Sequence, residues 1–217
     1  MVHKRTFLKI VTQTQKMKRR YKMQFKENQT AQKLRGGYYT PPDLALFISK
    51  WVTEPANCKN ILEPSCGDGN FIEAIAKAVN KEINIDAFEI EKSEFEKSKK
   101  RANDFNNLNL NISHKDFLEW FLKGRDTSLF YDGVVGNPPF IRYQYLPANS
   151  QAYAEQIYQR FSLPFRRHTN AWVPFVVTAV GLLKPGGRLG MVIPAEIMHV
   201  MHAQALRSFL GTNCSKI

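Results

Sequence analysis

The most specific chemistry in this sequence lies at Asn137-Pro138-Pro139-Phe140, which follows a β-branched pair at residues 134–135 and a glycine. The Asn137 side chain carries both a hydrogen-bond acceptor and donors. The two prolines fix φ and lack N–H groups, so the turn is stiff, extended and rich in carbonyl acceptors. Phe140 adds a flat apolar face. Such a turn is suited to gripping an exocyclic amine and stacking on the ring that bears it, although a proline pair alone is typical of an ordinary surface turn.

A second constellation follows the short apolar strand predicted at residues 60–62. It consists of Glu63, a tight loop with Gly67 and Gly69, and the start of a helix that runs to about residue 80. The glycines let a backbone approach a ligand closely, as in a Rossmann-like first turn, although the spacing differs from GxGxxG. A phosphate loop would need Gly-Lys-Ser/Thr, which is missing. The carboxylate of Glu63 repels phosphate and favours a cationic or hydroxyl-rich ligand.

Two further acids stand at predicted strand ends. Glu89 ends the strand predicted at residues 83–90, about 20 residues past the glycine loop, where an acid binds ribose hydroxyls. Asp116 and Phe117 follow the strand predicted at residues 110–114 and could hold an adenine, Asp116 by a hydrogen bond and Phe117 by packing. The alternative for Phe117 is an ordinary core residue.

The alternation of strands and helices predicts an α/β fold, with a mostly parallel sheet that has helices on both faces. We expect the helix before the glycine loop at residues 42–51, with Thr40 as its N-cap. The helix predicted at residues 91–103 is heavily charged, and we interpret its charges as solvated surface. Later helices are predicted at residues 172–183 and 195–210, on either side of a buried strand at residues 188–193. Residues 214–217 resemble the start of another strand.

The chain is strongly basic, with 217 residues, a net charge of +12 and a pI near 9.7, which favours a polyanionic partner. Residues 1–35 hold many of the cations, and their apolar spacing predicts an amphipathic helix in an arm that is solvated or contacts DNA, an organelle leader being the alternative. Residues 141–170 form a predicted long irregular stretch that interleaves cations with aromatic rings. A DNA contact or a tyrosine-rich cover over a core would each explain this stretch, and its candidate DNA-binding residues are Arg142, Tyr143, Arg160, Arg166 and Arg167.

The cysteines and the longest apolar run indicate the cellular compartment of the protein. The three cysteines form no CxxC pair, which fits a reducing, cytoplasmic location. The longest apolar run, residues 172–183, is too short to span a bilayer and contains Pro174. We expect neither a membrane partner nor a metal centre.

Taken together, these residues resemble the S-adenosylmethionine-dependent amino-methyltransferases, particularly the adenine-N6 DNA methyltransferases of restriction–modification systems. The likeness covers roughly residues 37–217. By resemblance, the methionine end of the cofactor is covered by Tyr39, Thr40 and Pro41. The first-strand loop of the cofactor site is Glu63, Ser65, Cys66, Gly67 and Gly69. The contacts to the ribose and adenine are Glu89, Ile90, Asp116 and Phe117. The catalytic motif is Asn137, Pro138, Pro139 and Phe140.

The resemblance implies a Rossmann-like class I methyltransferase fold, with a basic arm at residues 1–35 and a catalytic domain at residues 36–217. It implies S-adenosyl-L-methionine as cofactor and a flipped adenine in double-stranded DNA as substrate. In the resembled subgroup, further strands and a target-recognition domain follow the final helix, but this sequence stops at residue 217. We therefore expect a sheet of five strands with an exposed edge. We also expect a separate target-recognition or restriction subunit. A truncated reading frame or one half of a split enzyme would fit.

Other functions stay open at this point. Asn-Pro-Pro also occurs in methyltransferases that act on RNA or on protein glutamine side chains. A non-catalytic fragment that binds cofactor or DNA is a further alternative. Cys66 lies in the cofactor loop, so we do not expect it to act as the nucleophile that cytosine ring methylation requires.

Overall fold

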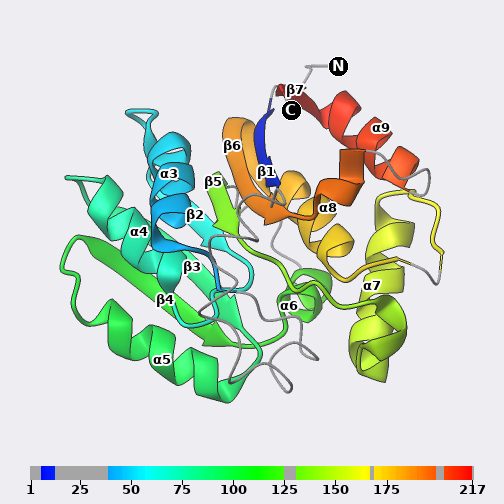
Figure 1. The fold of residues 1–217 in the computed structure, drawn as a ribbon, viewed down its shortest axis with the longest axis horizontal. Coiled ribbons are helices and arrows are strands. Elements are labelled where there is room, and N and C mark those ends of the chain that lie inside the picture. The colour runs from blue at the N-terminus through cyan, green and yellow to red at the C-terminus, as the bar shows by residue number, and fades with distance from the viewer. Residues whose placement is uncertain (1–5, 13–38, 125–130, 167–168, 199–202, 217) are drawn as a thin grey trace.

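The computed structural model describes residues 6–12, 39–124, 131–166, 169–198 and 203–216 (Figure 1). One sheet runs through the molecule in the order β4-β3-β2-β5-β6-β1-β7, and all of its pairs are parallel. Its strands are β1 (Thr6–Thr12), β2 (Asn60–Glu63), β3 (Ile83–Glu89), β4 (Leu108–His114), β5 (Tyr131–Gly136), β6 (Leu183–Ile193) and β7 (Cys214–Lys216). The sheet therefore turns from β2 to β3 and β4 in one direction and continues from β5 in the other, so a topological switch point lies between β2 and β5.

Helices cover both faces of the sheet (Figure 1). One face carries α3 (Pro42–Thr53), α4 (Asn70–Ala78) and α5 (Lys92–Ala102). The other carries α6 (Phe117–Lys123), α7 (Ala148–Arg160), α8 (Trp172–Gly181) and α9 (Gln204–Asn213). Within the described residues, no helix is both long and apolar enough to cross a membrane.

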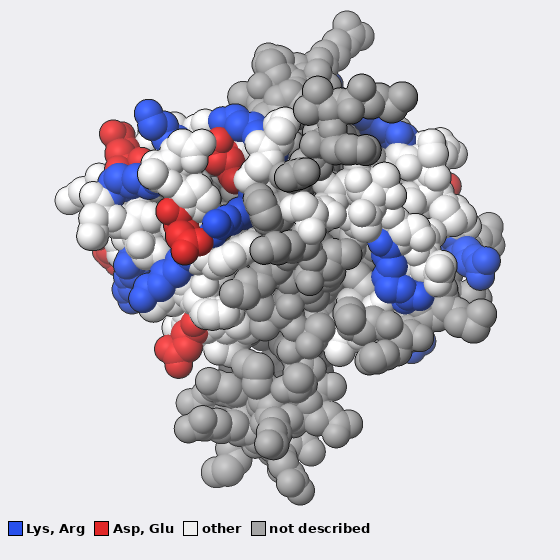
Figure 2. Space-filling model, turned by 90° about the horizontal axis from the view of Figure 1, so that it is seen from above, with Lys and Arg blue, Asp and Glu red and all other residues white. Residues whose placement is uncertain are grey.

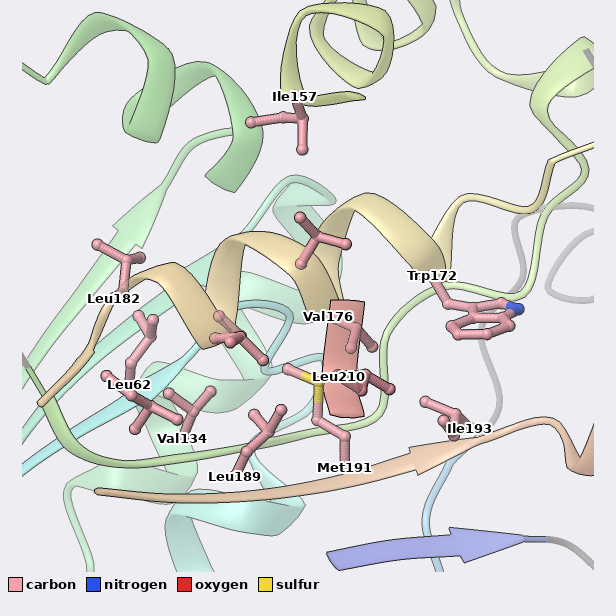
Figure 3. Packing of buried hydrophobic residues seen from close by; sticks show 14 of the residues in the cluster. Leu62, Val134, Ile157, Trp172, Val176, Leu182, Leu189, Met191, Ile193 and Leu210 are labelled. Atoms are coloured by element: carbon pink, nitrogen blue, oxygen red, sulfur yellow. The ribbon is translucent and has the colours of Figure 1, made fainter. Parts of the chain in front are cut away.

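The core is divided by the sheet because neighbouring residues of a strand point to opposite faces. In β5, Val134 belongs to the cluster under α6 to α9, whereas Val135 belongs to the cluster under α3 and α4. Figure 3 shows Leu62, Val134 and Leu189 side by side beneath α8. Burial on both faces explains why the central strands have near-continuous apolar sequences, and it fixes the ends of β2 and β5 in space.

The predicted fold class is confirmed by this arrangement, but two elements near the ends of the chain differ from expectation. Residues 6–12 form strand β1, so the prediction of a helix is wrong there. Phenylalanine, isoleucine, valine and threonine favour strands, and β1 pairs with β6 from Phe7 opposite Arg188 to Thr12 opposite Ile193. The expected bare edge after the fifth strand is therefore occupied, by β1 and then by β7. Residues 13–38 lie outside the described part, so an arm that ends at residue 35 stays a prediction.

The stretch at residues 141–170 is also more regular than predicted. A 3-10 turn, η1 (Tyr143–Tyr145), precedes the 13-residue helix α7. Ala154, Ile157 and Tyr158 are the buried residues of α7, and their spacing of three and four residues is that of a helix face. The charged and aromatic residues around them concealed this pattern. The helix predicted at residues 195–210 is shorter in the structure, with a 3-10 turn, η2 (Ala195–Met198), ahead of α9.

Candidate functional site

The predicted site residues meet where three strands end. Glu63 is the last residue of β2, Glu89 is the last residue of β3, and Asn137 directly follows β5. Because β2 pairs in parallel with both β3 and β5, these three carboxyl ends are neighbours at one edge of the sheet. In open α/β sheets this edge, at the switch point, is where ligands bind.

The loop after β2 is fixed to both neighbouring strands by hydrogen bonds. The Cys66 amide donates to the Phe88 carbonyl at 2.9 Å, and the Gly67 amide donates to Glu89 Oε2 at 2.8 Å. On the other side, the Ser65 hydroxyl donates to the Asn137 main-chain carbonyl at 3.3 Å. The loop and the Asn-Pro-Pro-Phe turn are thus held together directly.

The two glycines of the loop serve different purposes. Both have left-handed backbones, with φ of 54° at Gly67 and 88° at Gly69. A Cβ on Gly67 would meet no atom of the described residues within 4 Å, so among them the space above it is open to a ligand. A Cβ on Gly69 would lie 3.2 Å from Ser98 Cα, so this glycine allows α5 to pack closely.

Glu63 is a buried acid that has one oxygen without a partner among the described residues. It is 1% exposed, and its Oε2 has no hydrogen-bond partner among the described residues. Burial raises the pKa of Glu63 well above its usual range, and the nearby acids Asp68 and Glu89 raise it further. A cationic ligand at the end of β2 would supply what this carboxyl lacks.

Cys66 is 5% exposed, and burial raises the pKa of its thiol well above the ordinary value, followed by the effects of Glu63 and Glu89. The reactive form of cysteine is the thiolate. The thiol therefore stays protonated at neutral pH, in keeping with the expectation that Cys66 is no nucleophile.

The segment before α3 lies against the glycine loop. The Asn70 side chain donates to the Thr40 carbonyl at 3.4 Å, and the Tyr39 hydroxyl donates to Glu94 Oε2 at 3.0 Å. Thr40 is buried, but the N-cap of α3 is Pro41, so the prediction that Thr40 caps this helix is wrong. The chain turns into the helix one residue later than the sequence suggested, at the two prolines that fit its start.

The acid and aromatic residue after β4 have structural contacts. Asp116 caps α6, because its Oδ1 accepts from the amides of Leu118 at 2.8 Å and Glu119 at 3.2 Å. The spacing of Asp116 and Glu119 is that of a capping box, a signal that could have revealed this role. Phe117 is 2% exposed and packs in the core, which matches the alternative considered for it. Ile90 is 60% exposed at the same edge of the sheet and offers an open apolar side chain.

The Asn-Pro-Pro-Phe turn continues into a segment that main-chain hydrogen bonds hold in place. Pro138 is buried, and Phe140 is half-buried against the larger core cluster. The Tyr143 amide donates to the Thr169 carbonyl at 2.9 Å, and Ala171 donates back to Ile141 at 2.8 Å. The residues after the turn are thereby tied to the start of α8.

The candidate DNA-binding residues of this region divide into buried and exposed ones. Tyr143 is 6% exposed, its hydroxyl donates to the Glu155 carboxylate, and its ring packs edge-on to Phe165. Tyr145, which we did not single out, is 68% exposed. Sequence spacing could not tell which tyrosine would point outward. Arg142, Arg160 and Arg166 are exposed, and Arg167 lies outside the described residues.

Charge is unevenly spread over the molecule. Figure 2 shows acidic and basic side chains intermixed over the half that carries α3 to α5, whereas the visible charges over the half that carries α7 to α9 are mostly basic. Among the described residues of that half, Arg160, Arg166 and Arg207 are cations, and the acid Glu155 accepts the Tyr143 hydroxyl; Lys184 and Arg188 of β6 pair instead with Asp132 and Glu54. The half next to the Asn-Pro-Pro-Phe turn is therefore suited to an anionic partner.

Two solved structures with a similar fold are methyltransferases. A Listeria monocytogenes protein described as a class I S-adenosylmethionine-dependent methyltransferase matches 91% of this chain and 64% of its own, with a TM-score of 0.62 and 15% identity. The methyltransferase subunit of a type I restriction–modification system from Streptococcus thermophilus matches 80% of this chain and 38% of its own, with a TM-score of 0.59 and 16% identity. The fold is thus of the predicted class I methyltransferase type.

Sequence relatives point to one family. The type II methyltransferase M.AccI of Acinetobacter calcoaceticus is 28% identical over 80% of this chain and 30% of its own length. The type II methyltransferase M.BanIII of Aneurinibacillus aneurinilyticus is 29% identical over 84% of this chain and 34% of its own length. The chain thus spans about a third of these relatives.

The family profile described as Eco57I restriction-modification methylase matches residues 6–216, which include β1, the glycine loop, the Asn-Pro-Pro-Phe turn and β7. With a match over nearly its whole length, this chain belongs to the Eco57I family of restriction–modification methylases.

Proposed function

We propose that this chain transfers a methyl group from S-adenosyl-L-methionine to the exocyclic N6 amine of an adenine in double-stranded DNA. The observation that carries the proposal is the hydrogen bond between Ser65 of the glycine loop and the Asn137 carbonyl, because it joins the proposed cofactor site to the proposed amine site. Family membership supports methyl transfer as the reaction.

The described residues fit this cofactor. Glu63 is a buried acid whose Oε2 lacks a partner among them, and the space above Gly67 is open. When bound, the cofactor supplies a methyl group on a positively charged sulfur. Glu63 would face a positively charged part of the ligand, and Glu89 would accept hydrogen bonds from ribose hydroxyls. Ile90 would pack on the adenine ring.

The acceptor amine is a poor nucleophile, because its lone pair is delocalised into the ring. Asn137 and the Pro138 carbonyl would accept its two hydrogens and favour a tetrahedral nitrogen aimed at the methyl group. Phe140 would stack on the base once it has left the duplex. The enzyme's contribution is orientation and electrostatic stabilisation, without a covalent enzyme intermediate.

The basic half around α7 to α9 favours a nucleic acid over a protein glutamine, and the family's description as restriction-modification methylases favours DNA over RNA. Target recognition by residues outside 1–217, in the same chain or in a separate subunit, would agree with the greater length of the relatives.

The decisive experiment is transfer of a radiolabelled methyl group, followed by nucleoside analysis of the products. The assay contains the chain together with a target-recognition region, and offers duplex DNA, RNA and protein acceptors in parallel. We expect the label in N6-methyladenine. Label in cytosine, RNA or glutamine would refute the proposed substrate, and binding of cofactor without transfer to any acceptor would favour the non-catalytic alternative.

The ionisation of Glu63 leads to a pH prediction. Because burial raises its folded-state pKa above the unfolded value, its stabilising contribution is present at low pH and is lost as the pH rises through the folded pKa. A cationic cofactor favours the carboxylate instead. Binding should therefore release a proton, and affinity should increase as the pH rises. Calorimetry in phosphate and Tris buffers would measure the proton released.

Glu63→Gln is the matched variant, since it keeps the shape of the side chain but cannot ionise. This variant should bind cofactor more weakly than wild type, and fewer protons should be released per cofactor molecule bound. Equal proton release by wild type and Glu63→Gln would show that a different group, such as Asp68 or Glu89, ionises on binding.

Tyr145 is the aromatic residue that we expect to contact DNA beside the catalytic turn. Stacking on a base contributes about 1–3 kcal/mol, so Tyr145→Ala should weaken duplex binding by roughly tenfold, while Tyr145→Phe should retain most of it. Phe47→Ala is the control, because Phe47 is 51% exposed on α3. Fluorescence anisotropy at fixed salt would measure the affinities. Equal effects of Tyr145→Ala and Phe47→Ala would exclude a specific stacking role.

A further inference from the structure

Helix α5 presents polar side chains toward the protein. Its buried residue is Ser98, and Glu94 and Arg101 are half-buried. These three residues are spaced by four and three positions, so they lie along one face of the helix. Half-buried Phe95 and Ala102 lie beside them, so the inward side of α5 is mixed, with an acid, a serine and an arginine where packing faces are normally apolar.

Arg101 reaches the start of α4 and the glycine loop. Its Nη2 donates to Asp68 Oδ2 at 2.8 Å, and its Nη1 donates to Asn70 Oδ1 at 2.5 Å and to Glu73 Oε2 at 2.9 Å. The Arg101 side chain is 29% exposed and that of Asp68 is 17% exposed. A planar guanidinium with several partners in a partly buried place fixes geometry more strongly than a surface ion pair.

The other two residues of this face act on the same region. Ser98 packs against Gly69, where a Cβ would come within 3.2 Å of its Cα. The Glu94 carboxylate accepts a hydrogen bond from the Tyr39 hydroxyl. The carbonyl of the next residue, Thr40, accepts a hydrogen bond from the Asn70 side chain. Through these contacts α5 touches both the glycine loop and the segment that precedes α3.

We propose that Arg101 is a positioning residue for the cofactor, holding Asp68 and Asn70 so that the glycine loop is ordered before the cofactor binds. The inference rests on the proposed location of the cofactor at this loop. Asp68 lies between the loop glycines and needs a cation, because it is largely buried and close to the acids Glu63 and Glu94. Without Arg101, cofactor binding itself would have to order the loop, and the free energy of cofactor binding would become less favourable by the cost of that ordering.

The test compares Arg101→Met with Lys77→Met. Lys77 pairs with Glu73 Oε1 at 2.5 Å, and its side chain is 57% exposed. Arg101 also contacts Glu73, so Lys77→Met removes a cation beside this acid while leaving the contacts of Arg101 in place. Calorimetry with S-adenosylmethionine and its demethylated product would be run well below the melting temperature of each variant. We expect Arg101→Met to weaken both affinities by about tenfold or more, and Lys77→Met to change them by less than about twofold.

Two further variants separate positioning from mere stability. Arg101→Lys keeps a cation and should restore part of the affinity. In a double-mutant cycle, Asp68→Asn should have a smaller effect in the Arg101→Met background than in wild type. A folded Arg101→Met protein with a lower melting temperature and unchanged cofactor affinity would overturn the inference. If wild type itself binds neither ligand, the proposed function fails, and the inference fails with it.

Discussion

Replacing Asn137 with alanine should lower the rate of methyl transfer by about a hundredfold to a thousandfold, the usual cost of losing one hydrogen-bonding group that stabilises developing charge. The side-chain acceptor matters chiefly while the amine nitrogen becomes tetrahedral, so binding of cofactor and DNA should remain nearly unchanged. The prolines and Ser65 would keep the backbone of the turn in place, because the Ser65 bond goes to the main-chain carbonyl.

Single-turnover transfer of labelled methyl groups to duplex DNA measures this rate directly, and separate titrations measure the two affinities. Asn109→Ala is a suitable control, since Asn109 is exposed on strand β4 and bonds to Asn84 at 3.1 Å, away from the turn. Undiminished transfer by Asn137→Ala would refute the proposed mechanism. A parallel loss of cofactor affinity would show that Asn137 also supports the loop.

Replacing Glu89 with alanine should weaken cofactor binding by about a hundredfold, given that hydrogen bonds to charged groups contribute about 1.5–3 kcal/mol each. Three hydrogen-bonding contributions are lost together. The ribose hydroxyls lose their acceptor, and the Gly67 amide, which lies 2.8 Å from Glu89 Oε2, loses its partner. The Glu91 amide, 2.7 Å from Oε1, would lose its partner as well.

Glu89→Gln divides this effect, because one oxygen remains as an acceptor while the charge is removed. It should bind cofactor more tightly than Glu89→Ala and more weakly than wild type. Glu96→Ala, at an exposed position of α5, is the control for loss of an acid from the same region. Calorimetry at a temperature where all variants are folded decides the matter. An affinity of Glu89→Ala within about twofold of wild type would exclude Glu89 from the cofactor site.

The centre of the fold could be predicted from the sequence because several signals agreed there. Apolar strands, each followed by a loop with an acid or glycines and then by a helix, identified β2, β3 and β5 and the residues at their ends. The ends of the chain were harder. In Phe7, Ile10 and Val11 the apolar spacing fits a helix, while the residue types favour a strand, and only pairing with β6 decides between them.

The site was predicted less completely than the fold, because sequence does not show which face of an element packs. Glu94 and Arg101 belong to a highly charged helix, so their charges were interpreted as solvated, whereas Glu94 contacts Tyr39 and Arg101 contacts Asp68, both at the proposed cofactor site. Tyr143 and Tyr145 are two residues apart and have the same basic neighbours in the sequence, but Tyr143 is buried and Tyr145 is exposed. Asp116 was predicted to bind adenine, and its hydrogen bonds to α6 give it a capping role that the pattern also contained.

The place of β1 between β6 and β7 has a consequence for the order of folding. Phe7 pairs with Arg188, so β1 acquires this partner only after the intervening strands β2 to β5 have been synthesised. Contacts between residues so distant in sequence form slowly, because the intervening chain must be closed first. During translation, residues 6–12 have a β-prone sequence but no β6 to pair with until residue 193 has been synthesised, so we expect insertion of β1 beside β6 to be a late step of folding. Expression yield should depend on chaperone supply and on what is fused ahead of β1 more than on changes in the central strands.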